Sequence, residues 1–173
     1  MRSRRVEVPR DHPLRKFFGS ITMLSFEGIN FPDPEVVTYV ANLLTDFVQV
    51  DSLYALRDEE GRRLEYIVDM LILASEKGRA EERQTRKHIG DYCLFLSGLY
   101  PESLNRRAVG PAYYVSQGKA AYATVAAIDG VHPSGQLFRK LSARFEGCVT
   151  ALNLGKEYLQ DPFYQYLLRQ MEL

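Results

Sequence analysis

The sequence predicts an all-α fold, a single-domain bundle of six or seven helices over residues 1–173. Three observations carry this prediction. Apolar residues recur at spacings of three, four and seven along nearly the whole chain, as they do on one face of a helix. Proline and glycine fall between these segments, where helices begin and end. No convincing strand pattern is present, and the best candidate is the short RVEV near the N-terminus.

Composition supports an ordinary globular protein. The chain has 173 residues, of which 46% are hydrophobic and 25% charged, and one domain is the default at this length. Lys plus Arg and Asp plus Glu number 22 each, so the formal net charge is zero and no overall field attracts nucleic acid. The first sixteen residues are locally basic. We interpret residues 1–10 as a flexible basic tail, with a local phosphate contact as the alternative.

The first two helices are predicted over residues 13–26 and 34–50. Asp11 precedes Pro13, and Asp33 precedes Pro34. A capping acid before a proline in the first turn is a typical helix start. The sequence EGINFPDP between the two segments supplies glycine and prolines for a loop.

The third helix is predicted from about residue 52 to residue 76. Its middle, RDEEGRRLE, places Asp58 four residues before Arg62 and Glu59 four residues before Arg63, an order that stabilises an exposed helix. Gly61 either lies within this helix or marks a break. The following LEYIVDMLILAS is apolar almost all round, so we expect that half to be buried.

The remaining helices are predicted over residues 80–99, 112–128 and 135–159, with a short one over 162–171. The helices over 80–99 and 112–128 are expected to pack against each other, because each has faces of small residues. Leucine in place of Gly98 or Ala123 is then expected to cost about 1–3 kcal/mol by overpacking. The faces comprise Gly90, Leu94, Ser97 and Gly98 on the first helix, and Gly118, Ala120, Ala121, Ala123, Val125 and Ala127 on the second.

Polar groups gather at the start of the apolar run HIGDYCLFL. Helical steps of 100° place Asp91 about 60° and Cys93 about 140° from His88, so His88 and Cys93 cannot form a catalytic pair. Asp91 and Cys93 therefore drop out of a local reactive group. His88, Tyr92 and Glu81 remain on one stripe. The favoured interpretation is a helix that emerges from the core, with His88 hydrogen-bonded at the boundary; the alternative makes His88 a ligand or general base.

Two functions follow from these patterns. The first is a cytoplasmic helical interaction or scaffold module that acts as a homodimer or binds another protein. Its interface is expected in the C-terminal DPFYQYLLRQMEL, which has little polar face. The second is a small-ligand-binding protein or enzyme with an internal pocket. The pocket candidates are His88, Tyr92, Tyr114, Tyr122 and Glu81, and the interface candidates are Phe163, Tyr164, Leu167, Leu168 and Met171.

Other function classes lack a recognisable pattern. No Gly-x-Ser-x-Gly, His-Glu-x-x-His or Walker motif occurs, so no catalytic residue is assigned. No Glu-x-x-His is present and the two cysteines are lone, so we predict no metal site and no cofactor. Nucleic-acid binding is disfavoured, because acids interleave with the basic residues and the net charge is zero. The basic groups concerned are the N-terminal arginines and Arg79, Arg83, Arg86 and Lys87.

Apolar runs and cysteines indicate the compartment. The apolar runs are too short for a membrane span, and no hydrophobic region follows the basic start, so we expect neither a membrane protein nor a signal peptide. Cys93 and Cys148 both lie in apolar segments, which indicates buried free thiols and a cytoplasmic location.

Overall fold

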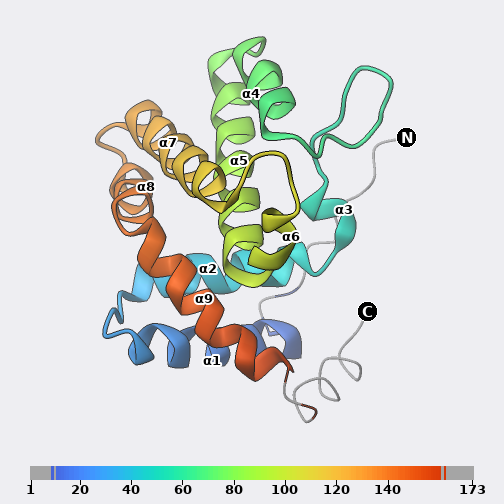
Figure 1. Cartoon of the computed structure of the whole chain (residues 1–173). Coiled ribbons are helices and arrows are strands. Elements are labelled where there is room, and N and C mark those ends of the chain that lie inside the picture. The colour runs from blue at the N-terminus through green and yellow to red at the C-terminus, as the bar shows by residue number, and fades with distance from the viewer. Residues whose placement is uncertain (1–8, 10, 161, 163–173) are drawn as a thin grey trace.

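A computed structural model describes residues 9, 11–160 and 162, apart from the side chain of residue 50. Within these residues the chain forms nine helices and no strand, in one compact domain, which confirms the all-α prediction (Figure 1). In chain order the helices are α1 (Pro13–Gly28), α2 (Pro34–Phe47), α3 (Val50–Leu53), α4 (Ile67–Ser75), α5 (Arg79–Leu99), α6 (Pro101–Asn105), α7 (Pro111–Asp129), α8 (Pro133–Ala143) and α9 (Phe145–Gln160).

Helix α5 is the centre of the fold. It packs against α7 and α9 and also contacts α2, α4 and α6, while α1 packs against α2 and α9 (Figure 1). Every residue from His88 to Leu99 is buried. The side chains of a helix covered on all sides contact other protein groups and not water. The C-terminal half of α5 therefore fixes the positions of its neighbours.

Proline and a capping side chain start several helices, as expected. Asp33 caps α2, and its carboxylate accepts hydrogen bonds from the backbone N–H groups of Glu35 and Val36 at 3.1 and 3.3 Å. At α1 the expected cap is wrong, because His12 and not Asp11 takes this position. The Nδ1 atom of His12 accepts from the N–H of Leu14 at 3.1 Å. A neutral imidazole nitrogen can satisfy a terminal N–H as an acid does.

The predicted helix over residues 52–76 is wrong as a single element. Helix α3 ends at Leu53 and α4 begins at Ile67. Between them the chain turns back at Gly61, whose φ of +80° lies in the left-handed region that favours glycine. Asp58 and Arg62 do form the expected ion pair, at 2.7 Å, but across this turn. The same spacing serves a tight turn as well as a helix, so the charge pattern could not distinguish them.

The predicted helix over residues 135–159 is also divided. It breaks at Arg144, whose φ of −110° and ψ of 22° are not helical, and forms α8 and α9. Leu141, Phe145 and Cys148 are all buried, so the apolar spacing continues across the break and conceals it. These two divisions and the short α6 raise the count above the expected six or seven.

Small residues bring α5 and α7 together, as predicted. A Cβ atom on Gly90 would lie 2.5 Å from the ring of Tyr122, and one on Gly118 would lie 2.9 Å from the Cβ of Cys93. Gly98 instead faces Leu152 of α9. The expectation for Ala123 is wrong, because Ala123 is exposed together with Ala120 and Ala127.

The apolar second half of the 52–76 segment is only partly buried. Ile67, Met70 and Ala74 face the core, whereas the side chains of Val68 and Ile72 remain 55% and 52% exposed. The prediction that this half is buried is therefore wrong for the outward side of α4. An edge helix that packs mainly on α5 leaves its other side in water.

Candidate functional site

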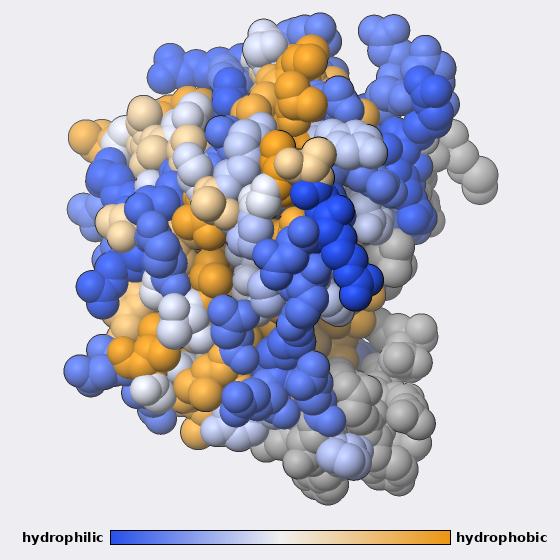
Figure 2. Space-filling model, in the orientation of Figure 1, coloured by the Kyte–Doolittle hydropathy of each residue, from blue (hydrophilic) through white to orange (hydrophobic). Residues whose placement is uncertain are grey.

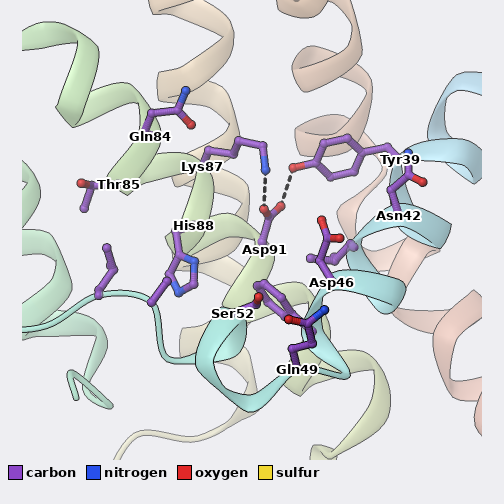
Figure 3. A pocket seen from close by; sticks show the side chains of 14 residues that line it. Tyr39, Asn42, Asp46, Gln49, Ser52, Gln84, Thr85, Lys87, His88 and Asp91 are labelled. Atoms are coloured by element: carbon purple, nitrogen blue, oxygen red, sulfur yellow. Dashed lines mark hydrogen bonds and ion pairs between the residues drawn. The ribbon is translucent and has the colours of Figure 1, made fainter. Parts of the chain in front are cut away.

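A cleft of about 680 Å³ opens between α2, α3 and α5. This volume lies within the range of small-molecule sites. Figure 3 shows Lys87 and Asp91 of α5 directed toward Tyr39 of α2, while His88 points toward α3 and the loop that follows it. Leu43 and Phe47 of α2, with Ala55 and Leu56 from the loop after α3, supply the apolar part of the lining.

Asp91 is the centre of a buried polar cluster beside this cleft. Its side chain is 5% exposed. The hydroxyl groups of Tyr39 and Tyr122 donate to Oδ1 at 2.5 and 2.7 Å, and the ammonium group of Lys87 donates to Oδ2 at 2.8 Å (Figure 3). The carboxylate thus joins α2, α5 and α7. A charge buried this deeply is stable only when it is paired and hydrogen-bonded, and here both oxygens are engaged.

The two phenols in the cluster stay protonated. Burial raises the pKa of Tyr39 well above its ordinary value, and the negative charge of Asp91 raises it further. Burial and the same carboxylate also raise the pKa of Tyr122. Both hydroxyl groups therefore act as hydrogen-bond donors at neutral pH. Lys87 completes the cluster, with its Nζ 5.3 Å from the ring centroid of Tyr39.

His88 lies on the wall of the cleft. It is buried and its ring packs against Phe47 and Tyr92, with centroid separations of 5.6 and 6.3 Å. The expected position at the boundary of the core is therefore only partly right, since the imidazole is enclosed by aromatic rings and borders the cleft. Its placement is fixed by α5, where it directly follows Lys87.

Charged groups around the cleft are already matched. Lys87 pairs with Asp91, and Arg15 approaches Asp46 at 3.9 Å and donates to the Asn42 side chain at 2.6 Å. In contrast, the side chains of three neutral residues on the cleft wall form no hydrogen bond with any residue that the structure describes. These residues are Ser52, Gln84 and Thr85.

The five pocket candidates do not form one pocket. His88 alone lines the cleft, and Tyr122 reaches Asp91 from α7. The hydroxyl of Tyr92 donates to the carbonyl of Glu65 at 3.3 Å. Tyr114 accepts from Arg107 at 2.8 Å. Glu81 is exposed and lies 3.7 Å from Lys77. Tyr92 and Tyr114 therefore belong to a separate polar contact beneath the loop before α4.

Sequence reasoning missed six site residues: Asp91, Tyr39 and Lys87 of the polar cluster, and Ser52, Gln84 and Thr85 of the cleft wall. Helical steps separate Asp91 from His88, which is correct within α5 but takes no account of the neighbouring helices. One signal was available: an acid inside a fully apolar run is almost never buried unless it is paired. The spacing of Lys87 and Asp91 at i,i+4 supplied one partner, whereas Tyr39 and Tyr122 come from distant parts of the chain.

A second cluster, at the start of α8, brings a serine, a histidine and an aspartate together. The hydroxyl of Ser134 donates to Asp129 at 2.7 Å, and Arg83 donates to both oxygens of Asp129, at 2.5 and 2.7 Å. The Nδ1 atom of His132 accepts the backbone N–H of Ser134 at 3.2 Å and also lies 2.7 Å from the Ser134 hydroxyl oxygen. The Ser134 hydroxyl donates its one proton to Asp129, whose carboxylate is already paired with Arg83. The imidazole caps α8 and the carboxylate ties α5 to the end of α7, so this cluster supports the structure at that junction.

Among the residues described, no group of three or more His, Cys, Asp or Glu side chains is arranged to hold a metal ion. In the same part of the chain, no helix combines the length and apolar character needed to span a bilayer. The interface candidates Phe163, Tyr164, Leu167, Leu168 and Met171 lie outside the described residues.

No family model, curated protein or solved structure matches the chain significantly.

Proposed function

We propose that the chain binds a small uncharged molecule in the cleft between α2, α3 and α5. The proposal rests on a difference between the charged and the neutral side chains that line the cleft. The charged side chains are engaged with one another, whereas the hydroxyl groups of Ser52 and Thr85 and the carboxamide of Gln84 have no described partner. A ligand with several hydroxyl or amide groups would use these neutral groups, and its apolar frame would rest on Leu43 and Phe47.

The chemistry favours binding without turnover. The carboxylate of Asp91 already accepts three hydrogen bonds. The phenols have raised pKa values and so remain protonated. The Asp91 side chain is only 5% exposed and is held in place by these three donors, so it is suited to fixing the cleft and poorly placed to take a proton from a bound molecule. Asp91, Tyr39 and Lys87 would hold the shape of the cleft, while Ser52, Gln84 and Thr85 would contact the ligand.

A paired panel of small molecules tests the proposal. Sugars, nucleosides and small amides are compared with their phosphorylated or carboxylated counterparts by ligand-observed NMR. We expect binding of neutral members that weakens in Thr85→Val and Gln84→Ala. Thr150→Val, on the exposed side of α9, is the matched control, because the Thr150 hydroxyl donates to the carbonyl of Glu146 and lies outside the cleft. Binding of the charged counterparts alone, or binding unaffected by both cleft substitutions, would contradict the proposal.

An interaction or scaffold module remains the second proposal. It is supported by exposed apolar side chains on two outer helices, namely Met23 and Leu24 of α1 and Val68 and Ile72 of α4. We propose self-association through the C-terminal segment 163–171, in the cytoplasm, where the two free buried cysteines would be stable. Light scattering of the whole chain and of a chain ending at Asp161 tests this. A dimer that persists after truncation excludes the segment as the contact.

A further inference from the structure

The outward side of α4 combines apolar and acidic residues in an ordered way. Val68 and Ile72, one helical turn apart, are 55% and 52% exposed. Steps of 100° per residue place Asp69 and Glu76 next to Ile72, along one edge of this apolar stripe. Both acids are exposed, and neither forms an ion pair with a residue that the structure describes. Figure 2 shows apolar surface at the top of the molecule, over α4.

The fold leaves this side of α4 accessible. Ile67, Met70 and Ala74 bury the opposite side. In Figure 1 α4 lies beside the upper part of α5, beyond the level of α2 and α9. Val68 and Ile72 are therefore not needed to close the core. Large apolar side chains that stay exposed on a protruding helix are a common feature of contact surfaces.

We propose that the face formed by Val68, Asp69, Ile72 and Glu76 docks an amphipathic helix of another protein, with Lys or Arg along one edge of its apolar stripe. Stripes spaced at i,i+4 on two helices pack together, so Val68 and Ile72 provide the apolar contact. The two carboxylates select a basic partner and increase its association rate. This inference is independent of the ligand cleft, because none of these four residues lines it.

The acids also discriminate against a second copy of this chain at the same face. A two-fold symmetric contact would bring Asp69 and Glu76 of one copy toward the same acids of the other. Like charges at a contact destabilise it. The α4 face therefore fits a basic partner better than itself, whereas the proposed C-terminal contact between copies would use a different surface.

Synthetic peptides test the charge requirement directly. A fluorescent amphipathic peptide of leucine and lysine is titrated with the whole protein at low and at moderate salt, and a leucine–glutamate peptide of the same pattern serves as the comparison. Fluorescence anisotropy is the readout. We expect the lysine peptide to bind, with affinity that falls as salt rises, and the glutamate peptide not to bind. The inference would be overturned if the two peptides bound equally well or if neither peptide bound.

Two double variants locate the contact. Asp69→Asn with Glu76→Gln should weaken binding of the lysine peptide roughly fivefold and flatten its salt dependence. Val68→Ser with Ile72→Ser should weaken it further while retaining salt dependence. The matched control is Val131→Ser with Glu157→Gln, which removes an exposed apolar group and an exposed acid elsewhere. A control variant that loses as much affinity as the α4 variants would show that binding is not at α4.

Discussion

The carboxylate of Asp91 accepts a hydrogen bond from the hydroxyl of Tyr122 at 2.7 Å, and this contact joins the two helices at the centre of the fold. Gly90 precedes Asp91, and a Cβ there would lie 2.5 Å from the Tyr122 ring. The Tyr122 ring therefore packs closely on Gly90, while its hydroxyl is fixed by Asp91. The contact combines close packing with a charge-assisted hydrogen bond, so it is sensitive to both volume and charge.

Removing the carboxylate should destabilise the protein strongly. Asp91→Ala leaves the buried hydroxyl of Tyr122 without an acceptor and Lys87 without its partner. We expect a loss of about 2–4 kcal/mol in the free energy of unfolding, measured by urea denaturation. Asp91→Asn keeps one acceptor oxygen and should lose less. If the alanine variant is as stable as the wild type, Asp91 does not organise this cluster.

Glycine substitutions in two helices should have opposite effects. Gly118→Ala forces a methyl group against Phe145 and Cys93, and the overpacking should cost about 1–3 kcal/mol. Gly147→Ala places its methyl group where no atom lies within 4 Å, so it should raise stability by about 0.5–1 kcal/mol through helix propensity. Thermal unfolding of both variants checks this. Shifts of the same sign would refute the close approach at Gly118.

The ion pair of Arg83 and Asp129 should contribute stability that depends on pH. Hydrogen bonds from Arg83 lower the pKa of Asp129 from 3.8 to about 2. A carboxyl with a lowered folded-state pKa stabilises the fold above its unfolded pKa, and this stability is lost as pH falls through the folded value. The shift corresponds to about 2 kcal/mol. We expect Asp129→Asn to be less stable by this amount at neutral pH.

The same comparison at acidic pH provides the control. The difference in unfolding free energy between Asp129→Asn and the wild type should shrink as the pH falls from about 4 to about 2, because both side chains are then uncharged. Urea denaturation at several pH values measures it. A difference that stays constant over this interval would assign the effect to packing and not to charge.

The two cysteines should resist thiol reagents in the folded protein. Burial raises the pKa of Cys148 to about 12 and raises that of Cys93 as well. The thiolate is the reactive form, so neither thiol should react with Ellman's reagent near neutral pH. Both should react once urea unfolds the chain. Rapid labelling of one thiol under native conditions would indicate local opening around that residue.

The sequence was sufficient for the helical class and for the pairing of α5 with α7. Periodicity and proline positions identify the helices, and Gly90 and Gly118 indicate the close contact. The breaks at Gly61 and Arg144 were not predictable from the same signals. Apolar spacing continues through Arg144, and the Asp58–Arg62 pair suits a turn as well as a helix.

The candidate site was predictable only in part. His88 was identified, because a histidine on an apolar stripe is visible in one helix. The partners of Asp91 were not, because Tyr39 is 52 residues away and Tyr122 is 31 residues away along the chain. Their meeting depends on how α2 and α7 pack on α5. Tertiary contacts of this kind are absent from any local sequence pattern.

The turn at Gly61 has a practical consequence. Glu59 and Glu60 are exposed at its tip, and an antiparallel bridge between Arg57 and Arg63 holds its two arms together. A foreign segment inserted between Glu59 and Glu60 would therefore enter and leave at neighbouring points without stretching the helices on either side. This position suits an epitope or a fluorescent domain that reports on the protein while both termini stay unchanged.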